Sequence, residues 1–165
     1  MAIVFKAIKP TTLRKDAFRL EFLSMMHKAE REMLKDFRLT AETWEHKPVF
    51  QSQISLIGGP SLLVGTDDEI YGYVNNGTPS HVIQPKLASV LSFQTDFTPK
   101  TVPGVIGSKS GGKSGPRRRA KAVQHPGFEA RKFDDTIQKK WKPIFKDRSH
   151  EAMKKAAQKS GHGVT

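Results

Sequence analysis

Apolar residues recur every three or four positions over a long segment near the start of the chain. This spacing places them on one side of a helix, so it predicts an amphipathic α-helix that ends at about Phe37. Pro10 and the hydroxyl residues Thr11 and Thr12 precede the segment, and such residues are typical of a helix start. The periodic positions are Ala17, Phe18, Phe22, Met25, Met26, Ala29, Met33 and Phe37.

The apolar stripe of this first helix is wider than one packed face requires. It is extended by four leucines: Leu13, Leu20, Leu23 and Leu34. Two interpretations are open. The helix is either deeply buried in the core of one subunit, or it packs on its own sheet on one side and on a neighbouring subunit on the other.

A second helical pattern lies near the end of the chain. We predict a helix from Lys132 to about Lys159, with a kink or break at Pro143 because proline removes one backbone hydrogen bond. We expect the tail, residues 160–165, to be disordered. The apolar stripe of this helix consists of Phe133, Ile137, Trp141, Ile144 and Phe145.

Between the two helices the period changes to that of strands. Residues 49–57 and 61–66 flank Gly58-Gly59-Pro60, which predicts a hairpin. Residues 88–97 predict a third strand, and residues 121–124 a fourth that pairs with the third. Residues 1–8 are interpreted as a short strand or an apolar arm.

This order of elements predicts an α+β fold in a single domain over residues 1–159. We expect a small antiparallel sheet of about four strands, packed by long N- and C-terminal helices. A long flexible loop is expected between the last two strands, at residues 98–122, because this segment is rich in Gly, Ser, Lys and Arg.

A fixed corner is predicted at residues 71–86. An amphipathic turn of helix comes first, and Asn75, Asn76 and Gly77 then tolerate the positive φ that a chain reversal needs. Pro79 and Pro85 prevent a helix from following. Such a corner usually holds two larger elements at a set angle.

The charge of the chain is +12, which favours polyanions or acidic proteins as partners. Seven basic residues and no acid lie in residues 98–123, so the predicted loop is a candidate contact with phosphates. A solvated loop without a ligand is an equally good interpretation. The residues that we assign as DNA-facing are Lys109, Lys113, Arg117, Arg118, Arg119 and Lys121.

No catalytic constellation stands out. Residues 107–114 match the phosphate-binding pattern GxxxxGK[ST], but Gly115-Pro116-Arg117 follows instead of an apolar helix, so we interpret the match as accidental. The six histidines lack metal-ligand spacing; His81 and His125 could approach each other in the fold, and we interpret such a pair as structural hydrogen bonding and not as a metal site. There is no cysteine and no apolar run of 18 residues, so we predict no thiolate metal site, no cofactor and no membrane span.

The corner also carries a resemblance. Together with a later His-Pro-Gly, it resembles the small neck or tail-completion proteins (head–tail joining proteins) of long-tailed bacteriophages. The similarity covers roughly residues 5–145. The matching residues are Tyr73, Asn76, Gly77, Thr78, Pro85, Lys86, Val123, His125, Pro126, Gly127 and Phe133, and Pro79 completes the corner.

This resemblance implies a non-enzymatic virion protein that forms a ring, typically of six copies, in the neck or tail. The implied neighbours are head-connector proteins and tail-terminator or tail-tube proteins, with double-stranded DNA passing through the lumen. The implied location is the virion, after assembly in the host cytoplasm. The alternative, argued from charge, is a sequence-independent nucleic-acid-binding protein that acts through the basic loop and the C-terminal helix.

Overall fold

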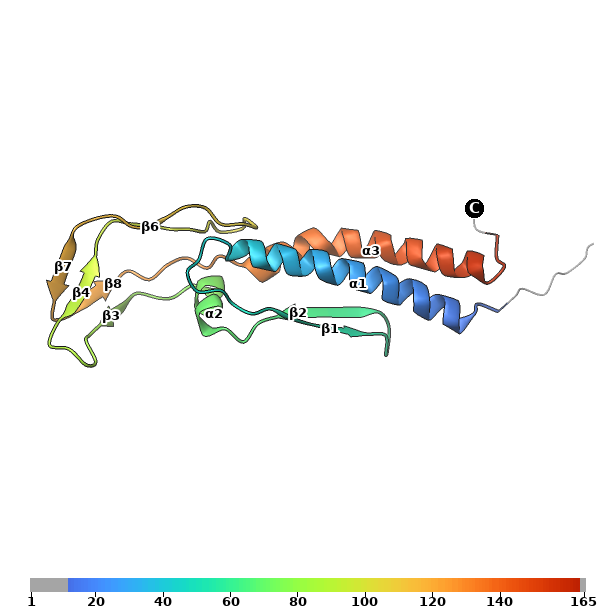
Figure 1. Ribbon diagram of the computed structural model, residues 1–165, viewed down its shortest axis with the longest axis horizontal. Coiled ribbons are helices and arrows are strands. Elements are labelled where there is room, and N and C mark those ends of the chain that lie inside the picture. Colours follow the sequence, from blue (N-terminus) through green and yellow to red (C-terminus); the bar gives the residue numbers. More distant parts are fainter. Residues whose placement is uncertain (1–11, 164–165) are drawn as a thin grey trace, which may run out of the picture.

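The structure, a computed structural model, describes residues 12–163. The segment interpreted as a strand or apolar arm, residues 1–8, lies outside the described residues. The molecule is elongated: two long helices lie side by side at one end, and a narrow arm of paired strands extends from the other (Figure 1). Within the described part of the chain, no helix is long and apolar enough to cross a membrane.

The two long helices are antiparallel partners. Helix α1 spans Lys15–Thr40 and helix α3 spans Phe133–Lys159, so both predicted helices are confirmed. Ion pairs join them at intervals along their length, for example Arg148 to Glu32 at 2.7 Å. Helix α3 continues through Pro143 without a break, because residues on both sides of the proline are held against α1.

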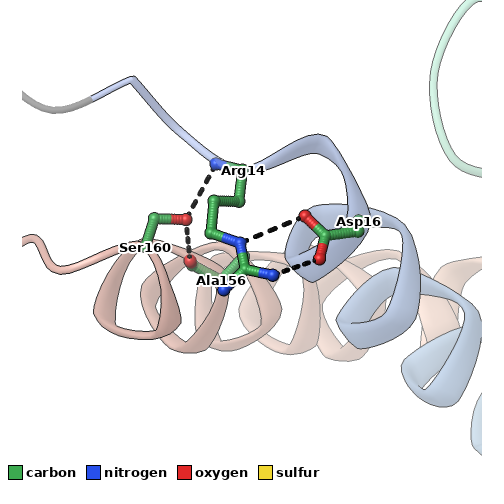
Figure 2. Close-up of polar contacts among 4 residues, drawn as sticks. All are labelled: Arg14, Asp16, Ala156 and Ser160. Carbon is green, nitrogen blue, oxygen red and sulfur yellow. Dashed lines mark hydrogen bonds and ion pairs between the residues drawn. The ribbon is translucent and has the colours of Figure 1, made fainter.

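The far end of this pair is closed by a cap on α3. The backbone N–H of Arg14 donates to the Ser160 hydroxyl at 2.9 Å, and that hydroxyl donates to the Ala156 carbonyl at 2.8 Å (Figure 2). Ser160 is buried. The prediction of a disordered tail is therefore wrong for Ser160, which is the ordered C-cap residue of α3. Residues 164–165 lie outside the described range.

The main core lies where residues 50–74, between the two long helices in the sequence, pack against both α1 and α3. Aromatic rings meet there, with Tyr71 5.0 Å from Phe50 and 5.6 Å from Phe133 between ring centroids. Towards the far end, α3 contributes buried Ala152 and Ala156 to the contact between the helices, and α1 contributes buried Phe22 and Met26. The buried members of the main core are Ala29, Phe37, Phe50, Tyr71, Phe133, Ile137 and Trp141.

The predicted hairpin is confirmed as β1 (Gln51–Ser55) and β2 (Ser61–Gly65), with Gln53 opposite Leu63. Alternation gives the hairpin two different faces. Leu62 and Val64 pack against the core, whereas Leu63 points outwards and is 68% exposed. The short helix α2 (Glu69–Asn76) follows, also as predicted.

The arm consists of three strand pairs, and none of them joins β1–β2 in one sheet. Strand β3 (His81–Ile83) pairs with β8 (Val123–His125), β4 (Leu91–Gln94) with β7 (Arg117–Ala120), and β5 (Phe97–Thr98) with β6 (Gly112–Lys113). The α+β class is correct, but the single sheet of about four strands is wrong: residues 12–163 form four two-stranded sheets.

The predicted pairing of residues 88–97 with residues 121–124 is also wrong. The arginine run of β7 occupies the place beside β4, and the chain beyond it returns to β3. Within residues 98–122, the end of β5, all of β6 and all of β7 are paired strands, so this segment is not one unbroken loop, whereas residues 99–111 between β5 and β6 contain no strand.

The tip of the arm folds back onto the helices (Figure 1). Thr101 is buried and Ile106 packs against the main core. The Ser108 hydroxyl accepts from the Thr43 N–H at 3.0 Å, and the Lys100 ammonium donates to the Thr43 carbonyl at 3.0 Å. The arm is thus attached to the body at both its base and its tip.

Candidate functional site

The base of the arm is a compact joint between two distant parts of the chain. Thr78 and Phe128 exchange both backbone hydrogen bonds at 3.0 Å. Gly77 and Gly127 flank this bridge with φ of +74° and +78°. A Cβ on Gly127 would lie 2.2 Å from the Thr78 carbonyl oxygen, so only glycine fits there. The two segments that carry the family resemblance, residues 76–78 and 125–127, therefore meet at this joint.

The same joint also caps helix α3. The side-chain oxygen of buried Asn75 accepts from the Phe133 N–H at 2.8 Å, which satisfies a donor that a helix start leaves open. The Val74 and Asn75 carbonyls accept from the Arg131 and Lys132 N–H groups at 3.2 and 3.0 Å. Sequence reasoning missed this role of Asn75, because the capping residue lies 58 positions before the helix that it caps.

The other predicted corner residues divide into two groups. His125 belongs to the joint: its Nδ1 accepts from the Gly127 N–H at 3.0 Å, and its ring centroid lies 5.1 Å from that of His81. Pro79 lies against Gly127. Tyr73, Asn76 and Pro126 are exposed. The tyrosine that serves the core is Tyr71.

Burial sets the acidity of Tyr71. Desolvation by the core raises the pKa of its phenol to about 12, because the charged phenolate is disfavoured there. Beside it, Asp68 caps α2 by accepting from the Tyr71 N–H at 2.8 Å. The hydrogen bond from His46, followed by that from the Tyr71 N–H, holds the pKa of Asp68 below its ordinary value.

The arm concentrates the positive charge of the molecule. Residues 78–128 contain eight Lys and Arg residues and one acid, a net charge of +7 out of +12. Because directly opposite residues share a face, Arg117 and Arg119 lie on one face with Gln94 and Ser92. Arg118 lies on the other face, opposite Phe93.

The six predicted DNA-facing residues are all exposed, but they do not form one cluster. The structure brings the three arginines together on β7, with Lys121 just beyond them. Lys113 lies on β6. Lys109 lies at the docked tip, where its carbonyl accepts from the Thr43 hydroxyl at 3.0 Å.

The arm also presents apolar side chains that no described part of the chain covers. Leu87 is fully exposed, Phe97 is 63% exposed and Val82 is 56% exposed. A two-stranded ribbon has no interior, so its apolar residues stay in water unless another surface covers them.

The match to the phosphate-binding pattern, residues 107–114, ends in the two-stranded ribbon of the arm. Lys113 lies on β6 opposite Phe97, and the next element is strand β7, so no helix N-terminus follows to bind phosphate. Among residues 12–163, no group of three or more His, Cys, Asp or Glu side chains is placed to hold a metal ion.

No family model, no curated protein and no solved structure matches this chain.

Proposed function

We propose that the chain is a non-enzymatic structural subunit of a phage neck or tail. Copies form a ring, typically of six, that joins the head connector to the tail and lets the genome pass. The observation that carries this proposal is the arm, a ribbon without a core that projects from the helices (Figure 1). Its exposed side chains are apolar and basic. Such a surface is typical of a protein that neighbours complete.

The joint at the base of the arm supports the same proposal. The segments that carry the resemblance, Asn76-Gly77-Thr78 and His125-Pro126-Gly127, form one structural unit that fixes where the arm leaves the body. On α1, Leu20 is 64% exposed, so the wide apolar stripe reaches the surface and offers a second contact area. The proposed partners are other copies, the adjacent connector, the tail-terminator or tail-tube proteins and the DNA in the lumen, and the proposed location is the virion.

The proposal is tested by deleting the gene for this chain from the viral genome that encodes it. We expect filled heads and complete tails that fail to join, and joining restored when the wild-type chain is supplied separately. Peptides of the chain should be found in wild-type virions. Infectious virions that contain every other protein but lack this one would refute the proposal.

A second candidate function, sequence-independent binding of nucleic acid, is favoured by the three exposed arginines of β7. A two-stranded ribbon fits the major groove, and exposed Arg and Lys side chains neutralise phosphates. The test replaces the arm residues Lys113, Arg117, Arg118 and Arg119 by serine. This function predicts weaker binding to unrelated DNA sequences alike, with the log–log salt slope reduced by about 0.9 per lost contact. Unchanged DNA binding would eliminate it.

A further inference from the structure

The outer face of the β1–β2 hairpin is apolar or uncharged, and nothing in the described chain covers it. The inner face packs on the core through Phe50, Leu62 and Val64. On the outer face, Val49 is 70% exposed and Leu63 is 68% exposed. The other outward positions are Gln51, Gln53, Ser55 and Ser61.

Acidic residues gather at one end of this face. The register puts Gln51 opposite Gly65, so the segments before β1 and after β2 lie at the same end of the hairpin, and the His46–Asp68 contact joins them. Residues 41–76 contain five acids and one basic residue, a net charge of −4. That basic residue, Lys47, donates to the Ala41 and Glu42 carbonyls at the end of α1.

The acids of this end are free to bind a cation from outside. Glu42, Glu45, Asp67 and Glu69 are exposed, and none of them forms an ion pair with another described residue. We call these four residues and the outer face of β1–β2 the hairpin surface.

The arm has the complementary properties. It carries a net charge of +7 and exposed apolar side chains, and no carboxylate in the described chain pairs with Arg117 or Arg119. An apolar centre with a charged rim of opposite sign on each partner is the usual composition of a specific interface.

The two surfaces lie on opposite sides of α2 within one molecule. Figure 1 shows β4 and β7 in the part of the arm farthest from the long helices, and β1–β2 beneath those helices. The tip of the arm is docked on the body by its contacts with Thr43, so the β7 segment is held away from the hairpin. Within one copy, therefore, the arm does not cover the hairpin surface.

We propose that the arm of one copy lies across the hairpin surface of a second copy, with Arg117 and Arg119 beside its acids. The inference rests on the self-association in the proposed function and names the surfaces that make it. Because the contact joins two different surfaces, it is head-to-tail, and it closes a ring when the rotation between copies allows.

A charge exchange tests this contact. The arm variant R117E/R119E and the surface variant E45R/D67R should each weaken self-association at least about tenfold in sedimentation velocity, because like charges would face each other. An equimolar mixture of the two variants should associate as wild type does, since each arm then meets a surface of opposite charge. The chain that carries all four substitutions should associate with itself for the same reason.

The control is K28E/K35E, which changes the net charge as much as the arm variant does but at exposed α1 positions. It should associate like wild type, and circular dichroism should show every variant folded. The contact is refuted if R117E/R119E self-associates like wild type. This holds also if that variant binds DNA more weakly than wild type does. It is also refuted if neither the mixture nor the four-fold variant recovers, or if the wild type stays monomeric at about 1 mM. If the contact is refuted but peptides of the chain are found in virions, the proposed location of the chain in the virion is retained and only this contact is rejected.

Discussion

The joint at the base of the arm should not tolerate a single added methyl group at Gly77. Its φ of +74° and ψ of 170° lie in a region that is essentially restricted to glycine. A Cβ there would lie 2.6 Å from the Ala130 nitrogen and 2.8 Å from the Phe128 oxygen, both backbone atoms. The conformation alone costs about 1–3 kcal/mol, and forced contacts add about 1–3 kcal/mol. Gly77→Ala should therefore lower the free energy of unfolding by about 2–6 kcal/mol.

Gly58 supplies a matched control for the contact with the backbone. Its φ of +72° is nearly the same, but no atom lies within 4 Å of the position that an added methyl group would take. Gly58→Ala should cost only the conformational part, about 1–3 kcal/mol. Urea unfolding followed by circular dichroism measures both losses. If the two substitutions destabilise the protein equally, the close packing of the Thr78–Phe128 bridge against Gly77 is refuted.

Three further changes test the core and the capping of the helices. Asn75→Ala should cost about 1–2 kcal/mol in urea unfolding because the Phe133 N–H loses its acceptor, and Asn75→Asp, which keeps an acceptor, should cost less; equal losses would contradict the capping role. The pKa of the Tyr71 phenol is about 12 in the folded protein and about 10 in the unfolded chain. Burial of the neutral phenol therefore contributes fully to the free energy of unfolding below about pH 10, and this contribution is lost as the pH rises through 12. Tyr71→Phe should make this alkaline loss of stability smaller, and an unchanged pH profile would show that the phenol is not buried. Asp36→Ala removes the acceptor that Trp141 Nε1 contacts at 2.7 Å, so unfolding should become easier by about 1–3 kcal/mol, and no loss would mean that the bond is dispensable.

The helices and the hairpin were predictable because local periodicity specifies them. Phe22, Met26, Phe37 and Trp141 follow the helical period, and all are buried. Turn chemistry likewise predicted the hairpin and the positive φ of Gly77. These elements depend on residues that are close together in the sequence.

The arm was not predictable in the same way, because its strands are only two to four residues long and pair across distant positions. Arg117-Arg118-Arg119 has the composition of a solvated loop, yet hydrogen bonding to Leu91–Gln94 makes it a strand. The docking of the tip depends on Thr101, Ile106 and hydrogen bonds to Thr43, and no periodic pattern in the sequence marks these residues. Pairing of this kind follows from the whole fold and leaves little pattern in the sequence.

We propose that this chain is a ring-forming subunit that connects a phage head to its tail. The most direct test is to locate an epitope tag, added after Thr165, in intact virions by gold labelling and electron microscopy. We expect label at the head–tail junction of tagged virions and none on untagged virions. Label confined to the capsid surface or to the distal end of the tail, or tagged protein that is absent from virions, would contradict it.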